Sequence, residues 1–279
     1  MGAIHLYLVR HGESVDNVAN LYAGSRDASL TSHGVLQARR LGTHLALRTA
    51  SAPVSHIFAS NLQRAYRTAE AVCDALSTPP NATEGETSSS TTGRRVEVVQ
   101  LPELREKHFG SGEGQKVGAR AVGERHVGAE TSEAMFTRAK KFVDEYLGPI
   151  FACVEEGAES VVVIAHGIIL GVLVRALRSA KNLGTVVASP EDQLPLAWSN
   201  TGYVELLVTP AAPPSKEPAT APTWPGLSIK TVAVNSTGHL QGLKKTRGGI
   251  GSAKFDEKQK TLNAFFTPTA KKRKHGDDA

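Results

Sequence analysis

Two short apolar runs constrain the fold of this chain more than any other feature. Ile4–Val9 is followed by Arg10 and the pair His11-Gly12, and Ser160–Ala165 leads directly into the pair His166-Gly167. Short, continuous apolar runs rich in β-branched residues predict strands that are buried on both faces, as in parallel sheets. Ligands bind beyond the carboxyl ends of such strands, so we expect both histidines at one edge of a sheet.

Segments with helical spacing alternate with further strand-like pieces. We expect helices over Ser32–Ala50, Ser60–Leu76 and Ser132–Val154, and strands over Ser55–Ala59, Arg95–Leu101, Tyr203–Val208 and Ser228–Val234. Alternation of strands and helices is typical of α/β proteins, in which helices cover both faces of the sheet. The sequence therefore predicts an α/β three-layer sandwich with a mostly parallel central sheet.

Composition divides the chain into a folded domain over residues 1–243 and a tail over residues 244–279. The tail contains ten Lys or Arg and four Asp or Glu, and it has little apolar patterning, so we expect it to be disordered. Polar, Pro-rich stretches at about 77–94 and 210–225 predict mobile insertions within the domain. The domain itself is nearly neutral, which argues against a nucleic-acid site on it.

The two cysteines and the apolar runs bear on the compartment. Cys73 and Cys153 lie in helix-like stretches without a CxxC pair, which favours small buried side chains in a reducing compartment. The first apolar run is too short for the core of a signal peptide, and Val161–Leu177 is interrupted by His166 and Arg175. We therefore expect neither a secreted nor a membrane-spanning protein.

The residues expected at the sheet edge suit chemistry on a phosphoryl group. A neutral histidine ring nitrogen can attack phosphorus, and the resulting phosphohistidine divides one difficult displacement into two easier ones. The guanidinium groups of Arg10 and Arg64 offer planar forks for the phosphoryl oxygens. His11 or His166, together with these arginines, is therefore a candidate phosphate site.

Five blocks of motif occur in a characteristic order and spacing. They are Leu8–Ser14 with Asn17, Leu30-Thr31 with Gly34, Ser60–Ala69, Leu104–Gly110 and Ala165–Gly167. Over residues 3–243 this pattern resembles the histidine phosphatase (phosphoglycerate mutase-like) superfamily. The resemblance implies that His11 is the phosphorylated nucleophile and that Arg10, Arg64 and His166 form its phosphate pocket. It further implies substrate contacts from Asn17, Gly24, Ser25 and Gly167.

The resemblance also implies a general acid in the block that ends at Gly110. Glu106 occupies the position of the carboxylic acid that protonates the leaving oxygen and then activates water, and Glu103 is the alternative three residues earlier. The register of Phe109-Gly110 favours Glu106. His166, if cationic, would add positive charge near the equatorial oxygens of the transition state. Since no cluster has metal-site spacing, we expect a reaction on a phosphorylated substrate without metal or other cofactor.

Two departures from the family pattern affect the expected reaction. After the position of Gly110, many family members have an aromatic residue before Glu-Gly, whereas this chain has the run Ser111–Gly114 without an aromatic residue. A substrate preference therefore cannot be taken from the family. After the Glu106 block, where the resemblance implies that a mutase carries a long lid with additional arginines, this chain has only the segment Gln115–Glu130. Arg120 and Arg125 lie within this segment and keep the mutase as an alternative. A metal-independent phosphatase is therefore favoured, with a phosphoglycerate-type mutase and a non-catalytic clamp-binding scaffold as alternatives.

The tail contains a second kind of signal. Its segment 259–266 resembles the sliding-clamp (PCNA) binding peptide called the PIP box, with Gln259 as the polar anchor and Leu262, Phe265 and Phe266 as one apolar turn. The cluster Lys271-Lys272-Arg273-Lys274 is a candidate signal for an import receptor. We therefore expect docking on the clamp in the nucleus, with the cytoplasm as a second location.

Overall fold

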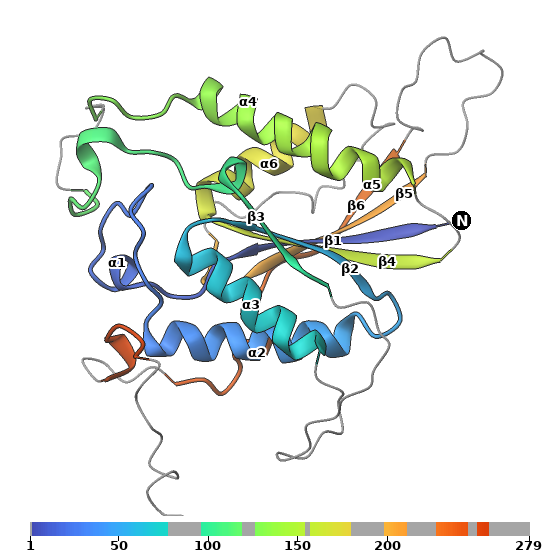
Figure 1. Cartoon of the computed structure of the whole chain (residues 1–279), viewed down its shortest axis with the longest axis horizontal. Coiled ribbons are helices and arrows are strands. Elements are labelled where there is room, and N and C mark those ends of the chain that lie inside the picture. Colours follow the sequence, from blue (N-terminus) through green and yellow to red (C-terminus); the bar gives the residue numbers. More distant parts are fainter. Residues whose placement is uncertain are drawn as a thin grey trace, which may run out of the picture.

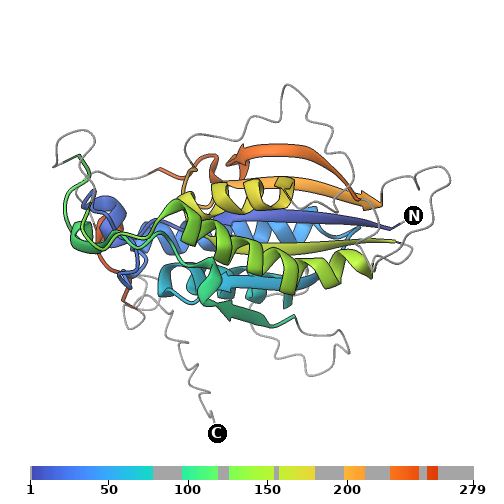
Figure 2. The same cartoon turned by 90° about the horizontal axis from the view of Figure 1, so that it is seen from above.

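The computed structural model describes residues 2–77, 96–118, 126–153, 157–179, 198–210, 227–244 and 250–256. Six strands form one sheet in the order β3-β2-β4-β1-β5-β6 (Figures 1 and 2). Their bounds are β1 Ala3–Arg10, β2 Val54–Ser60, β3 Val98–Leu101, β4 Ala158–Ala165, β5 Tyr203–Pro210 and β6 Leu227–Ser236. Strands β1 to β4 are paired in parallel, whereas β5 and β6 are antiparallel to their neighbours. The predicted α/β fold with a mostly parallel central sheet is confirmed.

Helices cover both faces of this sheet (Figure 1). One layer holds α2 (Ser32–Arg48) and α3 (Gln63–Ser77), and the other holds α4 (Ser132–Phe142), α5 (Gly148–Ala152) and α6 (Gly167–Ser179). Successive side chains of β1 enter opposite cores, since Leu6 and Leu8 pack with the α4 and α6 layer and Tyr7 and Val9 pack with the α2 and α3 layer. Burial on both faces explains why the strand sequence is continuously apolar.

Shorter elements complete the described chain. They are α1 (Val15–Val18), the 3-10 turns η1 (Pro102–Leu104), η2 (Gly110–Gly112), η4 (Gly238–Leu240) and η5 (Ile250–Ser252), and the π-helical segment η3 (Val143–Leu147). Within the residues that the structure describes, no helix combines the length and the apolar character needed to cross a membrane.

The topology brings several chain segments to one edge of the sheet. Strands β2, β4 and β1 are parallel neighbours, so Ser60, His166 and His11 lie at or just beyond their carboxyl ends. The His11 amide donates to the Ala165 carbonyl at 3.0 Å, which ties the ends of β1 and β4 together. Helices α3 and α6 begin at this same edge, and β5, which runs antiparallel to β1, starts there.

Two helices differ from the sequence-based expectation. Strand β2 extends through Ser60, so the helix expected from Ser60 begins only at Gln63. The single helix expected over Ser132–Val154 is divided by the π-helical segment η3, which directly precedes Gly148-Pro149. Pro149 has no backbone N–H and cannot continue the hydrogen-bond ladder, so a local change in helix type is expected ahead of it.

The C-terminal segment also differs from expectation in part. Residues 250–256 lie against the start of α2, where the Ser32 amide donates to Ala253 and the Phe255 amide donates to Leu30. Three residues outside the predicted domain 1–243, Ala253 to Phe255, are thus held by main-chain bonds or a bridge, which composition alone does not reveal. The predicted insertions, beyond Ser77 and Pro210, and residues 257–279 lie outside the described residues. Cys73 is buried as expected, whereas Cys153 is exposed.

Two glycines inside helices provide a matched test of packing. A Cβ atom on Gly42 of α2 would lie 2.5 Å from the Ala71 carbonyl oxygen of α3, whereas a Cβ atom on Gly171 of α6 would meet nothing within 4 Å. We expect Gly42→Ala to lower the free energy of unfolding by about 1–3 kcal/mol through overpacking. Gly171→Ala should raise it by about 0.5–1 kcal/mol, because alanine costs less backbone entropy in a helix. Urea unfolding of both variants measures these changes, and equal effects would contradict the observed α2–α3 contact.

Candidate active site

A cavity of about 430 Å³ opens at the edge of the sheet where the parallel strands end. It is lined by Arg10, His11, Asn17, Gly24, Arg64, Glu106 and His166, all of them expected from the sequence, and by Asn200, which was not expected. Ser25 and Gly167 are not among the described residues that line it. Segments more than 150 residues apart in the sequence therefore contribute to one polar hollow.

His11 is buried and held in a defined tautomer. Its Nδ1 lies 2.6 Å from the carbonyl oxygen of Gly12. Because a carbonyl can only accept, Nδ1 carries the proton and Nε2 keeps its lone pair. Burial, followed by the charges of Arg64 and Arg10, holds the pKa of His11 well below its ordinary value. His11 is therefore a neutral imidazole with a nucleophilic Nε2.

His166 lies against His11, with the ring centroids 4.9 Å apart and the planes at 62°. Its Nδ1 accepts a hydrogen bond from Arg64 Nε at 3.2 Å, so its proton resides on Nε2, which lies 2.9 Å from the Ser60 hydroxyl. Burial, and next the charge of Arg64, lowers the pKa of His166 well below its ordinary value. The sequence allowed a cationic His166. In the structure the ring is instead neutral, and both of its nitrogens take part in hydrogen bonds.

The two arginines form the cationic part of the cavity. Arg64 is 1% exposed, and its terminal nitrogens donate to the Arg26 carbonyl at 2.6 Å and to the Gly24 carbonyl at 2.8 Å. Burial lowers the pKa of Arg64 to about 10, against the attraction of nearby carboxylates such as Glu106. Each terminal nitrogen has two protons, so one on each remains for an anion. Arg64 is thus a cation at neutral pH.

Arg10 has a donor that the protein does not satisfy. Its Nη1 donates to the Trp198 carbonyl, while its Nε is buried and has no hydrogen-bond partner within the part of the chain that the structure describes. A buried guanidinium N–H without an acceptor is costly. An anion bound in this cavity would relieve that cost, and burial already lowers the pKa of Arg10.

The two candidate acids lie in different surroundings. Glu106 lines the cavity, and its carboxylate accepts from the amides of Ile168 and Ile169 in the first turn of α6 at 3.2 and 3.3 Å. Glu103 is not among the described lining residues, and its carboxylate accepts from Lys141 of α4 at 2.7 Å. Geometry thus places Glu106, rather than Glu103, beside the two histidines.

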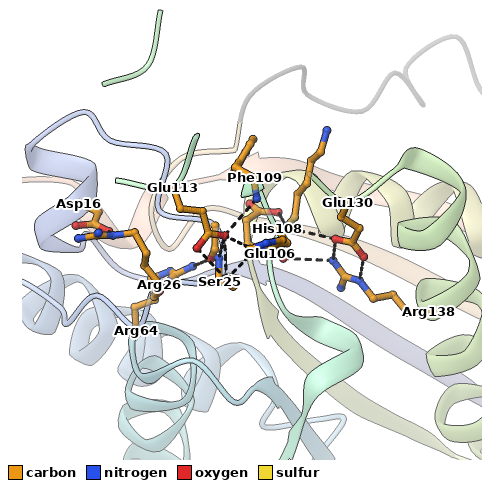
Figure 3. A network of polar contacts seen from close by, with 12 residues as sticks. Asp16, Ser25, Arg26, Arg64, Glu106, His108, Phe109, Glu113, Glu130 and Arg138 are labelled. Carbon is orange, nitrogen blue, oxygen red and sulfur yellow. Dashed lines mark hydrogen bonds and ion pairs between the residues drawn. The ribbon is translucent and has the colours of Figure 1, made fainter. Parts of the chain in front are cut away.

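Ser25 has a different partner from the one expected. Its hydroxyl and its backbone amide are hydrogen-bonded to the carboxylate of Glu113, which also accepts from the Phe109 amide (Figure 3). Glu113 thus accepts from both donors of Ser25, and the substrate contact of Ser25 stays a prediction. Glu113 instead joins the loop of Gly24 to the loop that follows Glu106.

Asn200 is a site residue that sequence reasoning missed. Its Nδ2 donates to the His11 carbonyl and to Asn17 Oδ1, both at 3.1 Å. It precedes β5, and only the antiparallel pairing of β5 with β1 brings this turn back to the end of β1. A polar turn before a strand was the available signal, but local sequence does not specify strand direction.

The walls of the cavity beyond the two arginines and two histidines are partly apolar and partly polar, with Asn20 among the polar residues. Their apolar residues include Leu21, Tyr22, Phe109, Val117 and Ile168. The rings of Tyr22 and Phe109 pack with their centroids 4.8 Å apart, and Val117 and Ile168 are exposed at 46% and 43%. Apart from Glu106, the described side chains of these walls carry no charge, so the part of a ligand beyond its phosphate would meet largely uncharged surface.

The buried histidines make stability depend on pH. His11, His166 and His239 all have lowered pKa values in the folded protein, that of His239 falling to about 4 through burial and then repulsion by His44 and Arg40. In the unfolded chain each titrates near its ordinary value of about 6.5. The unfolded state thus binds more protons below that pH, so the free energy of unfolding should fall between about pH 7 and pH 5, by up to about 1.4 kcal/mol per pH unit for each histidine.

Urea unfolding of the wild type and of His239→Gln across this range tests the expectation. The variant lacks one depressed histidine, so its stability should decline less steeply as the pH is lowered. The same slope in both proteins would show that His239 does not titrate as its surroundings require.

Comparisons with known proteins show which proteins this chain is similar to. Residues 6–85 match the model of the histidine phosphatase superfamily (branch 1). A probable phosphatase of Schizosaccharomyces pombe is 28% identical over 92% of this chain and 78% of its own length. A probable phosphoglycerate mutase of Erwinia tasmaniensis is 29% identical over 62% of this chain and 74% of its own.

Solved structures share the fold. A mycobacterial glucosyl-3-phosphoglycerate phosphatase superposes with a TM-score of 0.60 at 21% identity, covering 84% of this chain and 99% of that one. A phosphoglycerate mutase of Bacillus anthracis superposes with a TM-score of 0.58 at 20% identity, covering 86% of this chain and 96% of that one. The homologues are therefore phosphatases and mutases built on one architecture.

Proposed function

We propose that this chain, whose homologues are the histidine phosphatases and the phosphoglycerate mutase-like proteins, is a phosphomonoester hydrolase that acts through a phosphohistidine at His11. The observation that carries the proposal is the state of His11. Its ring is neutral, its Nδ1 proton is held by Gly12, and its Nε2, which has no hydrogen-bond partner among the described residues, belongs to the same cavity as Arg10 and Arg64. A nucleophile with a lone pair next to two fixed cations suits attack on a phosphoryl group.

In the first step His11 Nε2 attacks phosphorus while the bond between phosphorus and the ester oxygen breaks. The leaving oxygen takes a proton from the carboxylic acid of Glu106, so the products are a neutral alcohol and a phosphohistidine. Arg10 and Arg64 remain charged throughout and neutralise the phosphoryl oxygens. In this scheme His166 acts by holding Arg64 Nε rather than by carrying charge itself.

In the second step the Glu106 carboxylate accepts a proton from water, and the water oxygen attacks phosphorus. The bond between phosphorus and Nε2 breaks, which restores neutral His11 and releases inorganic phosphate. Glu106 is again protonated and ready for the next ester. Glu106 provides both proton transfers. Neither histidine changes its charge, except His11 while it carries the phosphoryl group.

The described cavity lining favours hydrolysis over isomerisation of a phosphoglycerate, because it offers no further Arg or Lys. The carboxylate of phosphoglycerate would face Glu106 and uncharged side chains among the described lining, since Arg10 and Arg64 bind the phosphoryl group. We therefore favour a monoester with an uncharged leaving group. Arg120 and Arg125, the candidate lid cations, lie outside the described residues.

A panel of phosphomonoesters tests the reaction type. The purified chain is incubated in EDTA with p-nitrophenyl phosphate, a sugar phosphate, a nucleoside monophosphate and 3-phosphoglycerate, and both inorganic phosphate and isomerised phosphoglycerate are measured. Release of phosphate from one or more esters supports a metal-independent phosphatase. Isomerisation without release would identify a mutase, and neither product from any ester would leave only the scaffold function.

We further propose that the tail segment 259–266 tethers this enzyme to the sliding clamp in the nucleus. The motif and the basic cluster 271–274 lie outside the described residues. The proposal of a tether is therefore supported by their sequence and by the place where the described chain ends. Residues 253–255 are hydrogen-bonded to the start of α2, and the motif begins three positions after Asp256. The described chain thus ends at the domain three positions before the motif begins.

Binding of a peptide of residues 254–270 to purified clamp tests the tether. Binding should be lost when Phe265 and Phe266 are both changed to alanine, because they supply most of the apolar surface of the motif. Unchanged affinity would contradict the proposal. For localisation, the full chain with residues 271–274 changed to alanine should be depleted from the nucleus, and an unaltered distribution would rule out this import signal.

A further inference from the structure

Arg138, on the second turn of α4, contacts the loop that carries Glu106. Its Nη1 donates to the carbonyl oxygens of Glu103 at 2.7 Å and Arg105 at 2.6 Å, and its Nη2 lies 3.3 Å from the carbonyl oxygen of Glu106. One guanidinium thus holds three main-chain acceptors over four consecutive positions. Arg138 is not a lining residue of the cavity, so it does not reach the reacting atoms.

The guanidinium is itself held in place by Glu130. Arg138 Nε and Nη2 donate to the two oxygens of Glu130 at 2.7 and 2.9 Å, and the two side chains are only 19% and 17% exposed (Figure 3). Burial opposes ionisation of Glu130, but the hydrogen bonds and charge of Arg138 outweigh it and lower the pKa of Glu130. Such a forked pair fixes orientation as well as distance.

Glu130 is connected to the same loop on its other side. The His108 amide donates to the Glu130 carboxylate at 3.2 Å, and the Glu130 amide donates to the His108 carbonyl at 2.8 Å. Arg138 and Glu130 therefore hold the loop before and after Glu106. The Glu106 carboxylate then extends from this fixed main chain to the first amides of α6.

We propose that Arg138 is a positioning residue that sets the place of the general acid Glu106 relative to the leaving oxygen. The inference rests on the proposed phosphatase function. Proton transfer requires the donor within hydrogen-bond reach of the leaving oxygen, so a small shift of this loop reduces acid catalysis without altering the phosphate pocket. The structure separates the two functions, because Arg10, His11, Arg64 and His166 come from other segments.

The dependence of the rate on the leaving group distinguishes positioning from general stability. Phenyl phosphate and p-nitrophenyl phosphate are similar in size, but only the phenolate strongly needs a proton as it leaves. We expect Arg138→Met to lower kcat/KM for phenyl phosphate about 10- to 100-fold and that for p-nitrophenyl phosphate less than about threefold. Equal losses on both substrates, or no loss, would overturn the positioning role.

Two further variants guard against simple misfolding. Arg138→Lys keeps the positive charge beside Glu130 but lacks the fork that spans several carbonyls, so it should show the same selectivity with a smaller loss. Lys141→Met is the matched control, because Lys141 lies one turn further along α4 and binds the Glu103 carboxylate of the same loop. Its ratio of the two kcat/KM values should equal that of the wild type, and a ratio like that of Arg138→Met would refute the assignment.

A double-mutant cycle with Glu106→Gln gives an independent readout. If Arg138 acts through Glu106, adding Arg138→Met to Glu106→Gln should lower kcat/KM for phenyl phosphate by less than about threefold more. If the losses in kcat/KM of the two single variants multiply in the double variant, Arg138 acts elsewhere than through Glu106. Absence of turnover by the wild type would refute the phosphatase function and this inference together, whereas wild-type turnover with an unchanged ratio in the Arg138 variants would refute the inference alone.

Discussion

Replacement of His11 by asparagine should abolish turnover, lowering kcat for p-nitrophenyl phosphate by more than about 10⁴-fold, because removal of a covalent nucleophile leaves only binding and charge stabilisation. Asparagine can still donate to the Gly12 carbonyl, so the loop between β1 and α1 keeps that contact. Rapid quenching with a phosphoryl-labelled substrate should trap acid-labile label on the wild type and none on the variant.

A control variant makes this result specific. His56→Asn changes another histidine of the sheet, on β2, whose ring packs on Phe58 and is not among the described cavity residues. It should retain both turnover and labelling. Equal labelling of His11→Asn and the wild type would place the phosphoryl group on another side chain and end the proposed mechanism.

Replacement of Glu106 by glutamine should have the second largest effect. The amide can occupy the same space but cannot donate a carboxylic proton or accept one from water. We expect kcat/KM for phenyl phosphate to fall by about 10²–10⁴-fold, the usual contribution of general acid catalysis. With p-nitrophenyl phosphate, whose leaving group needs little protonation, the labelled phosphoenzyme should accumulate because water is no longer activated.

Glu103→Gln is the natural control for this prediction. Glu103 is three residues away in the same block, but it is bound by Lys141 on the side of α4. Its replacement should change kcat/KM less than about threefold and should not cause label to accumulate. If the labelled phosphoenzyme accumulated in Glu103→Gln alone, Glu103 rather than Glu106 would be the general acid.

Local sequence determined the elements that meet at the site. Strands β1 and β4 could be predicted because burial on both faces requires continuous apolar residues, and the rule that ligands bind beyond parallel strand ends placed His11 and His166 at one edge. Arg10 needed no further information, since it adjoins His11. The positions of Arg64 and Glu106 followed only from the order and spacing of the matched blocks.

Other features depended on contacts between distant segments. The side-chain partners of Ser25, the approach of Asn200 to His11 and the contacts of Arg138 with the Glu106 loop each join positions between 32 and 189 residues apart. No local periodicity encodes such pairs. The neutral state of His166 belongs to the same class, because it follows from burial and from Arg64, not from the residues next to it in the chain.

By itself, then, the sequence determined the α/β class, the strand ends that bear the two histidines and the residue types available for phosphoryl chemistry. The tertiary structure alone decided which nitrogen of His11 carries the proton and which side chains hold the Glu106 carboxylate in place. The physical reason is that hydrophobic patterning acts over a few residues, whereas tautomers, pKa values and hydrogen-bond partners are set by whatever the folded chain brings within a few ångströms.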